Sequence, residues 1–291
     1  MQLSEFSECY RPRIQATLQE QAAEITVPKL RSVVLHILGK GKLFRPLLAL
    51  ATYRAVSGED AEHCIRLVTP LEMIHTATLI HDDLPCMDDA GLRRGVVAAH
   101  RQFGEALAVL AGDALLNLAT YILATQRAGI SERQRLRLIA AATRATHEAI
   151  QGQAVDIGAE GRSLALEELK KLHRKKTGSL LGACCETGAV LAGADDSLAE
   201  KLREAGVGIG LAFQIQDDLL SLESSEEAMG KTLDTDVTKA KSTFPRALGL
   251  EATQQYAAQA LEESCQAIEE LDLAKPDLLL AIAKQAVERT H

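Results

Sequence analysis

Residues 70–89 read PLEMIHTATLIHDDLPCMDD, and residues 205–222 read AGVGIGLAFQIQDDLLSL. The runs near 70–81 and 205–222 would be apolar on most faces of a helix, which predicts that both helices are central in the fold. Each stretch also carries an aspartate pair, Asp82-Asp83 in the first and Asp217-Asp218 in the second. Mg²⁺ prefers oxygen ligands and is commonly shared between a few carboxylates and substrate phosphates. If the two pairs face one cavity, the sequence predicts hard cations between two helices and chemistry on a diphosphate.

The rest of the chain is also predicted to be helical. Of 291 residues, 47% are apolar but only 3% are aromatic, so the core must consist mainly of Leu, Ala, Ile and Val. Helical periodicity recurs almost everywhere, and no alternating β-branched segment of useful length appears. We expect helices at 4–25, 28–38, 45–57, 60–82, 104–127, 132–157, 166–192, 197–223, 252–271 and 276–289. The sequence therefore predicts an all-α protein with a single large helical domain over residues 1–291.

The composition also excludes several classes of protein. A net charge of −8 argues against general nucleic-acid binding, because that binding needs cations to replace counterions. The six cysteines contain no Cys-x-x-Cys pair, which indicates reduced thiols and not a disulfide frame or a zinc site. The first twenty residues are polar, unlike a signal peptide, and no uncharged apolar run reaches the roughly 18 residues of a membrane span. We expect a cytoplasmic protein with no nucleic-acid partner and no membrane span.

The first aspartate cluster is predicted to form a metal site at the end of a helix. His75, Leu79 and Asp82 are spaced by four and three residues, so they share one helix face. Pro85 lacks an amide donor and interrupts the helix, which lets Asp88 return toward Asp82. A solvated acidic helix end is the simpler alternative. The neighbouring histidines also match the ligands of the helical His-Asp metal phosphohydrolases, but that reading leaves the second aspartate pair and the basic loops unexplained.

The second aspartate cluster is predicted to be a polar stripe on a buried helix. Gln214, Asp217, Asp218 and Ser221 have helical spacings and interrupt an apolar run over residues 207–222. Burying unpaired carboxylates is costly, so a metal ion or a cationic side chain is expected beside them. The alternative is a stripe that faces solvent.

Basic residues gather in several loops and suit the binding of phosphate. Residues 40–46 read KGKLFRP and place three cations beside a glycine at a helix start, where phosphate is favoured. Arg93-Arg94 follow the first cluster, residues 175–178 read KKTG, and Lys231 and Lys241 follow the second cluster. Each loop alone is more simply an exposed charged loop. Together they exceed the needs of one diphosphate and therefore indicate two diphosphate subsites.

With these residues in place, the chain resembles the short-chain trans-prenyl diphosphate synthases, close to the bacterial farnesyl and geranylgeranyl diphosphate synthases. The resemblance runs from about Leu30 to the C-terminus. It rests on Asp82-Asp83 with Asp88, on LRRG at 92–95, on AGDAL at 111–115, on KTG at 176–178 and on FQIQDD at 213–218. It implies an isoprenoid synthase-type fold, all-α, with a central cavity between helices.

The resemblance also implies an activity and a role for each motif residue. The activity is Mg²⁺-dependent head-to-tail condensation of isopentenyl diphosphate with dimethylallyl, geranyl or farnesyl diphosphate, giving a C15–C20 trans-prenyl diphosphate. About three Mg²⁺ ions per active site would be held by Asp82, Asp83, Asp88 and Asp217. The allylic diphosphate would be contacted by Arg93, Lys176, Gln214 and Lys231, with Thr177 and Lys241 nearby. Isopentenyl diphosphate would be bound by Lys42, Arg45, His75 and Arg94. The family is typically homodimeric.

Three positions bear on whether the chain is active and on what it makes. Leu43 and Ser221 stand where the family usually has Arg and the last Asp of the second motif. Ala77 stands near the place where a bulky aromatic closes the tail pocket at the farnesyl length, so alanine favours the longer geranylgeranyl product. Closure of the pocket by Ile74 or Leu116 is the alternative, because one side-chain volume rarely sets specificity alone.

Two other functions remain open on the sequence alone. An inactive partner subunit of such a synthase is suggested by the changes at Leu43 and Ser221. A terpene-forming lyase on the same fold needs no second substrate, so the predicted isopentenyl-binding residues Lys42, Arg45 and His75 argue against it.

Overall fold

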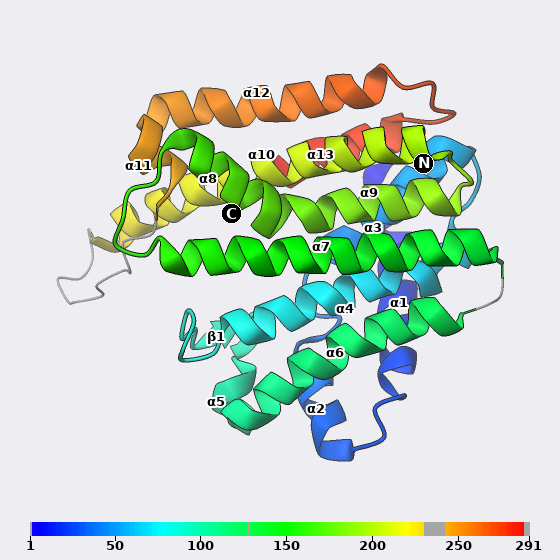
Figure 1. The fold of residues 1–291 in the computed structure, drawn as a ribbon, viewed down its shortest axis with the longest axis horizontal. Coiled ribbons are helices and arrows are strands. Elements are labelled where there is room, and N and C mark those ends of the chain that lie inside the picture. The colour runs from blue at the N-terminus through cyan, green and yellow to red at the C-terminus, as the bar shows by residue number, and fades with distance from the viewer. Residues whose placement is uncertain (1, 127–128, 230–241, 288–291) are drawn as a thin grey trace.

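The computed structural model describes residues 2–126, 129–229 and 242–287, which are mainly helical (Figure 1). The helices are α1 (Leu3–Ala22), α2 (Pro28–Ile37), α3 (Phe44–Ser57), α4 (Ile65–Asp82), α5 (Ala99–Phe103), α6 (Glu105–Thr125), α7 (Glu132–Gly158), α8 (Leu166–His173), α9 (Ser179–Leu191), α10 (Asp196–Met229), α11 (Phe244–Leu248), α12 (Leu250–Glu269) and α13 (Asp277–Val287). A short 3₁₀ turn, η1 (Glu62–Cys64), precedes α4, and a π-helical turn, η2 (Arg174–Gly178), separates α8 from α9. Two strands, β1 (Leu92–Arg93) and β2 (Val96–Val97), form a hairpin.

The predicted all-α fold is confirmed, with most helix ends within a few residues of the expected positions. The expected helix over 166–192 is divided by η2, and the expected helix over 197–223 continues to Met229. The short helices α5 and α11 and the β1–β2 hairpin did not emerge from the periodicity, because segments this short contain too few residues to show a period.

The two helices that carry the aspartate pairs lie in the interior, as predicted. α4 packs against α6, α3 and α9, and α10 packs against α9, α12 and α13. In the view of Figure 1, α4 and α6 lie on one side of α7, while α9 and α10 lie on the other. Met73, Ala77 and Ile80 of α4 and Ile209 and Ile215 of α10 are fully buried. The apolar faces of both helices therefore anchor their polar residues, at the end of α4 and within α10.

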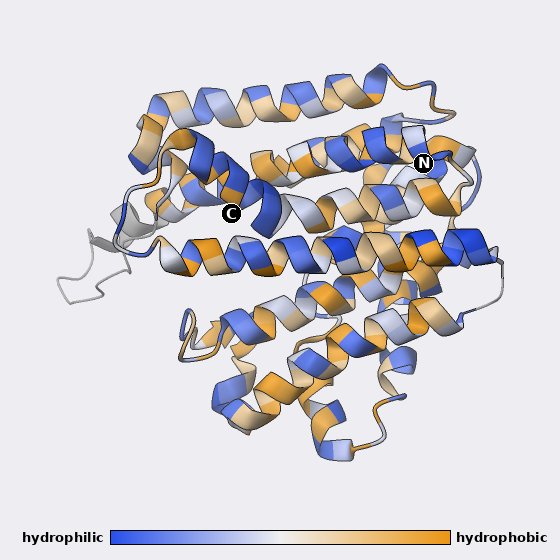
Figure 2. Ribbon diagram, viewed as in Figure 1, coloured by the Kyte–Doolittle hydropathy of each residue, from blue (hydrophilic) through white to orange (hydrophobic). Residues whose placement is uncertain are grey.

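Small and aliphatic side chains build the core, which follows from the scarcity of aromatic residues. Orange and blue segments alternate along most helices in Figure 2, as expected for helices with one buried face.

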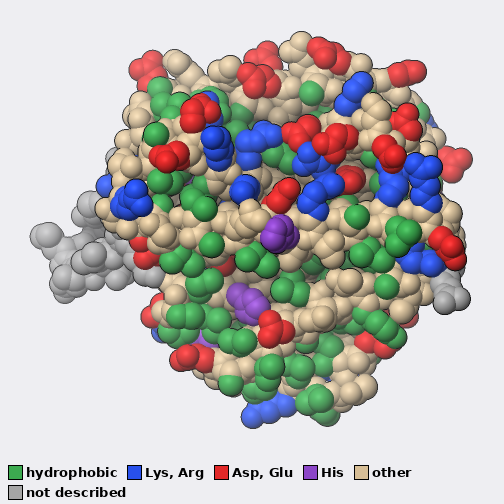
Figure 3. Space-filling view, in the orientation of Figure 1, with side chains coloured by type: hydrophobic (Ala, Val, Ile, Leu, Met, Phe, Trp, Pro, Cys, Tyr) green, Lys and Arg blue, Asp and Glu red, His purple; other side chains and the backbone are tan. Residues whose placement is uncertain are grey.

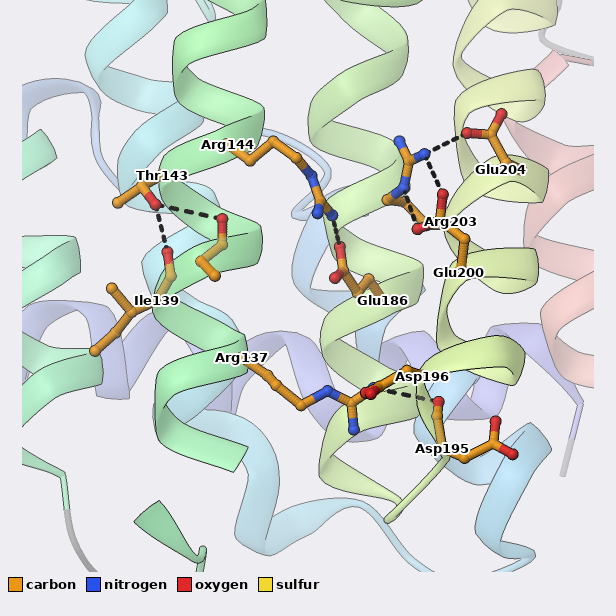
Figure 4. Close-up of polar contacts among 11 residues, drawn as sticks. Arg137, Ile139, Thr143, Arg144, Glu186, Asp195, Asp196, Glu200, Arg203 and Glu204 are labelled. Carbon is orange, nitrogen blue, oxygen red and sulfur yellow. Dashed lines mark hydrogen bonds and ion pairs between the residues drawn. The ribbon is translucent and has the colours of Figure 1, made fainter. Parts of the chain in front are cut away.

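In Figure 3, charged side chains gather over the part of the face that holds α7, α9 and α10. In Figure 4, Arg144 of α7 pairs with Glu186 of α9, and Arg203 pairs with Glu200 and Glu204 within α10. Such exposed pairs each contribute at most about 1 kcal/mol, so the apolar core holds the bundle together.

The β1–β2 hairpin projects from the segment that follows α4 (Figure 1). Arg93 pairs with Val96, so the two-residue loop is Arg94-Gly95. Both loop residues have positive φ, 52° and 78°, as a tight type I′ hairpin turn requires. The turn brings Arg93 and Arg94 back toward α4, where each meets a carboxylate.

Candidate active site

A cavity of about 600 Å³ lies between α4, α6, α7, α9 and α10, where the sequence predicted a central cavity. Its polar lining consists of Arg45, His75, Thr78, His81, Asp82, Asp113, Thr146, Gln153, Lys176, Thr177, Gln214 and Asp217. Its apolar lining includes Ile74, Leu79, Leu116, Ala145, Ala149, Ile150, Ile157, Leu180 and Phe213. One cavity therefore joins a charged region, which suits a diphosphate, to an apolar region, which suits a hydrocarbon tail.

The turn after α4 returns Asp88 to the end of the helix. α4 ends at Asp82, Pro85 is exposed in the following turn, and the backbone N–H of Asp88 donates to the carbonyl of Asp82 at 2.9 Å. His75, Leu79 and Asp82 all line the cavity, so the predicted shared face is confirmed. The predicted break near Pro85 is also confirmed, and it returns Asp88, which is exposed and not part of the cavity lining, close enough for its charge to act on Asp82.

The carboxyl group of Asp82 lies in an environment that disfavours its charge. Burial raises the pKa of Asp82 to about 6, the charge of Lys176 opposes that shift, and the charge of Asp88 adds to it. A carboxylate held in this way gains from a bound cation. Asp82 is therefore suited to hold a metal ion, as the sequence predicted.

Asp83, predicted to be a metal ligand with Asp82, is directed elsewhere. Its side chain is only 1% exposed and does not line the cavity. The guanidinium of Arg93 donates to both of its oxygens, with Nε at 2.8 Å from Oδ1 and 3.1 Å from Oδ2. The ion pair links the β1–β2 hairpin to the end of α4. Asp83, predicted to bind metal, and Arg93, predicted to bind diphosphate, therefore bind each other.

The second aspartate pair also divides between two tasks. Asp217 and Gln214 line the cavity, whereas Asp218 does not. Asp218 accepts hydrogen bonds from the backbone N–H of Phe244 at 3.0 Å and from Nε2 of Gln214 at 3.1 Å. Burial raises the pKa of Asp218 to about 6, and these two hydrogen bonds oppose the shift. Ser221 is exposed and does not line the cavity. The predicted polar stripe is therefore divided: Gln214 and Asp217 face the cavity, and Asp218 anchors Phe244.

The π-helical turn η2 presents Lys176 and Thr177 to the cavity. Nζ of Lys176 lies 2.5 Å from Oδ2 of Asp156, and Oγ1 of Thr177 donates to Oε1 of Gln214 at 2.9 Å. α7 approaches this turn closely, because a Cβ at Gly152 would lie 2.4 Å from the backbone nitrogen of Lys176. Single-turn π segments are frequent at functional sites.

Asp156 and Gln153 are two residues of the site that sequence reasoning missed. Asp156 holds Lys176, and Gln153 lines the cavity one turn before it on α7. Their signal in the sequence is faint, namely Gly152 followed by two polar residues at helical spacing in an otherwise ordinary helix. Only the contact with η2 shows that this face of α7 belongs to the site.

The predicted isopentenyl-binding residues gather around the N-terminus of α3. Arg45 and His75 line the cavity, while Lys42 is exposed in the loop before α3. Burial, together with the charges of Arg45 and Arg94, holds the pKa of His75 well below its usual value. The low pKa favours the neutral form of His75, whose ring can either donate or accept a hydrogen bond. Arg94 is not part of the cavity lining and pairs with Glu72 of α4.

The remaining predicted residues are two lysines and the alanine expected to bear on product length. Lys231 and Lys241 lie outside the described residues. Ala77 is fully buried and does not line the cavity, whereas the alternative pocket-closing residues Ile74 and Leu116 do. The role of Ala77 in product length stays a prediction.

The carboxylates do not form a closed metal cage. Among the side chains that the structure describes, in residues 2–126, 129–222 and 242–287, no group of three or more His, Cys, Asp or Glu is close enough together to hold a metal ion. Asp82 and Asp217 instead face the cavity from different helices. Such a donor set fits Mg²⁺, which keeps part of its shell for water and substrate phosphates and rarely uses an all-protein cage.

Comparison with known proteins gives a consistent result over nearly the whole chain. The family model described as polyprenyl synthetase matches residues 27–276. The chain is 42% identical over 264 residues to the farnesyl diphosphate synthase of Bacillus subtilis, covering 90% of this chain and 88% of that one. It is 40% identical over 258 residues to the chloroplastic geranylgeranyl pyrophosphate synthase of Capsicum annuum, covering 88% of this chain and 70% of that one.

A solved structure agrees with these sequence matches. The geranyltransferase of Helicobacter pylori, crystallised in complex with magnesium and isoprenyl diphosphate, superposes with a TM-score of 0.77 at 32% identity, and the match covers 95% of each chain.

Proposed function

This chain belongs to the polyprenyl synthetase family, and from that premise we propose that its central cavity is the active site and that the residues described above carry the reaction. The resemblance to the short-chain trans-prenyl diphosphate synthases is confirmed. The activity is therefore head-to-tail condensation of isopentenyl diphosphate with allylic diphosphates to C15–C20 products, catalysed by a trans-prenyltransferase.

One observation carries the assignment of the site. Asp82 at the end of α4 and Asp217 on α10 face the same cavity, whose other walls are largely apolar. Polyprenyl synthetases generally depend on Mg²⁺, and we propose that Asp82, Asp88 and Asp217 hold about three Mg²⁺ ions with the substrate phosphates. Bound there, Mg²⁺ would stabilise the negative charge that develops on the departing diphosphate. The magnesium and isoprenyl diphosphate in the Helicobacter pylori geranyltransferase support the proposal.

The allylic diphosphate is proposed to bind at the mouth of the cavity between η2 and α10. Lys176, Thr177 and Gln214 line this region, and the bond from Thr177 to Gln214 orients the amide. Arg93 lies behind Asp83 and contributes positive charge to the same side. Asp83 is therefore proposed to position Arg93, in addition to the metal-binding role that the family motif implies for it. Lys231 and Lys241 are proposed to complete the subsite.

The second diphosphate subsite is proposed to lie at the N-terminus of α3. Arg45 and His75 line the cavity there, with Lys42 in the preceding loop and Arg94 behind them. The first peptide N–H groups of a helix favour phosphate, and Arg adds a bidentate fork. Neutral His75 donates or accepts a hydrogen bond without adding charge. Isopentenyl diphosphate bound there would extend its double bond into the cavity.

The chemistry requires positioning, charge stabilisation and exclusion of water. The bond between C1 of the allylic substrate and its diphosphate oxygen breaks, and the electron pair leaves with the diphosphate. Lys176 and the other cations of the mouth stabilise that oxygen. The isopentenyl double bond attacks C1, and the proton lost to restore a double bond is accepted by the released diphosphate. The apolar walls exclude water, which would otherwise capture the allylic cation.

The length of the product is proposed to favour geranylgeranyl slightly over farnesyl. Small side chains support the longer product, because Ala145 and Ala149 line the tail region and Ala77 stands near the place where the resemblance implies a bulky aromatic at the farnesyl length. Ile74 and Leu116 line the same cavity, so a closer floor is the alternative. The relatives include both farnesyl and geranylgeranyl synthases and do not separate the two products.

The chain is proposed to act as a cytoplasmic homodimer through the outer face of α6. By length and composition alone, α6 is apolar enough to cross a membrane, although Ala108, Ala111 and Leu115 on one face are fully buried. Its other face carries Leu110 and Tyr121, which are 53% and 52% exposed, and hydrophobic side chains are frequent over this part in Figure 3. A second copy of the chain would cover this face.

The deciding experiment is product analysis. The purified protein is incubated with Mg²⁺, isopentenyl diphosphate and each allylic diphosphate in turn, and the products are identified after removal of the diphosphate. Elongated prenyl diphosphates with the wild type and none with Asp82→Ala are expected. Hydrocarbon release would favour the terpene-forming lyase, and no turnover would favour the inactive partner subunit. Near-normal turnover by Asp82→Ala would refute the metal assignment.

A further inference from the structure

Two adjacent arginines of the β1–β2 hairpin each end on a buried carboxylate near α4. Arg93 pairs with Asp83, as described above. Arg94 turns the other way, and its Nη2 donates to Oε1 of Glu72 at 2.7 Å. The Glu72 side chain is 1% exposed and the Arg94 side chain 13% exposed, so this second pair is almost entirely removed from water. A buried ion pair with this geometry fixes both side chains in place.

Other contacts confine the Arg94 guanidinium from several sides. Its Nη1 lies 3.4 Å from Oγ1 of Thr76 on α4 and 3.4 Å from the carbonyl of Ile37 at the end of α2. A Cβ at Gly41 would lie 3.2 Å from Nε of Arg94, so the glycine loop before α3 rests directly against this side chain. The contact with the Glu72 carboxylate, at 2.7 Å, is the shortest of these hydrogen bonds.

Glu72 lies behind the proposed isopentenyl diphosphate subsite and does not line the cavity. It precedes His75 by three residues and Thr76 by four, so one segment of α4 directs His75 to the cavity and Glu72 to Arg94. Burial raises the pKa of Glu72, and the charges of Arg94 and Arg45 oppose that shift. The carboxylate of Glu72 therefore interacts with both arginines of the subsite.

We propose that Glu72 is a positioning residue for the isopentenyl diphosphate subsite. It holds Arg94 against the Gly41 loop and at a fixed position relative to Arg45. The proposal rests on the function proposed above, which assigns these arginines to the second diphosphate. Glu72 acts through them, because it does not reach the cavity itself. It acts on one substrate only, since the allylic subsite proposed above is formed by η2 and α10.

The sign of the change in KM for isopentenyl diphosphate shows whether Glu72 acts by positioning Arg94 or only through its negative charge. A negative charge behind a diphosphate subsite repels the ligand, so neutralising Glu72 would lower the KM for isopentenyl diphosphate if charge alone mattered. If Glu72 holds Arg94 in place, the same change raises that KM, because a displaced guanidinium no longer holds its positive charge beside the subsite.

The test measures the KM for each substrate separately in wild type, Glu72→Gln, Glu72→Asp, Arg94→Gln and the double variant Glu72→Gln/Arg94→Gln. Glu72→Gln is expected to raise the KM for isopentenyl diphosphate by roughly tenfold or more and to change the allylic KM by less than about twofold. The double variant is expected to be no worse than Arg94→Gln alone, because Glu72 acts through Arg94. Glu72→Asp keeps the charge, and therefore tests position in a variant that is expected to fold.

The KM values of the Glu72 variants decide whether Glu72 positions Arg94. A lower or unchanged KM for isopentenyl diphosphate in both Glu72 variants would overturn the proposal, as would an equal rise in both KM values or a fully additive double variant. If Glu72→Gln does not fold, Glu72→Asp alone decides by the same split between the two KM values. A wild type that elongates no substrate would instead refute the proposed function, so the two failures are distinguishable.

Discussion

Asp82→Asn is predicted to stabilise the protein in the absence of metal while it removes the activity. Burial raises the pKa of Asp82 from 3.8 to about 6. The carboxyl therefore binds its proton more tightly in the folded chain than in the unfolded chain. The stabilisation that the protonated Asp82 side chain gives to the folded chain is fully present below pH 3.8. It is lost as the pH rises through the folded-state pKa of about 6. At pH 7 the ionised group destabilises the metal-free fold, and asparagine removes that charge.

The magnitude follows from the shift. A rise of about two pKa units corresponds to about 3 kcal/mol, and the buried amide of asparagine retains part of the desolvation penalty. We therefore expect a gain of about 1 to 3 kcal/mol in the free energy of unfolding at pH 7. For a chain of this size, each kcal/mol moves the Tm by about 2 °C, so the Tm should rise by about 2 to 6 °C.

The assay is thermal unfolding in EDTA, followed by circular dichroism at pH 7 and again near pH 4.5. The difference between variant and wild type should shrink at the lower pH, where Asp82 is mostly protonated. Asp113→Asn is the matched control, because it removes one negative charge at the same cavity from a side chain that is 55% exposed. With Mg²⁺ and inorganic diphosphate added, the wild type should gain more stability than Asp82→Asn.

Three results would refute this reasoning. The first is a Tm of Asp82→Asn in EDTA at or below that of the wild type. The second is a difference that persists unchanged at pH 4.5. The third is an equal gain from Asp113→Asn, which would show that relief of the net charge of −8 suffices as the explanation.

Three further perturbations test other parts of the site. Ala77→Phe is expected to shorten the main product by one five-carbon unit in product chromatography; an unchanged product, with a shorter one from Ile74→Phe, would put the pocket floor at Ile74. Asp156→Asn releases Lys176 from its ion pair and should raise the allylic KM by roughly tenfold. An equal change in the isopentenyl KM would contradict that role. Tyr121→Glu places a charge on the exposed face of α6 and should give a monomer in light scattering, whereas an intact dimer would move the interface elsewhere.

Local spacing along the chain was enough to predict the long helices and the residues of the site that share one helix face. Helical period and composition predicted nearly every long helix, because an amphipathic pattern over many residues reflects one buried face. The spacing of His75 and Asp82 placed them on one face, and Pro85 predicted the turn that brings Asp88 back. These features depend on neighbours within a few residues, so the sequence alone determines them.

Contacts between distant segments were decided only by the tertiary structure. The two aspartate pairs look alike in sequence, yet Asp83 meets Arg93 and Asp218 anchors Phe244, while Asp82 and Asp217 face the cavity. The direction of each side chain depends on how α4 and α10 are rotated by packing.

The pairing of charges has the same origin. Lys176 meets Asp156 across α7 and η2, and Arg94 meets Glu72 across the hairpin and α4. No spacing rule links residues that are 20 or 22 positions apart on different elements. The sequence by itself therefore predicted the long helices, the family and the class of substrate. The folded chain decided which of the charged groups face the substrates and which hold the others in place, because burial selects partners by distance in space and not along the chain.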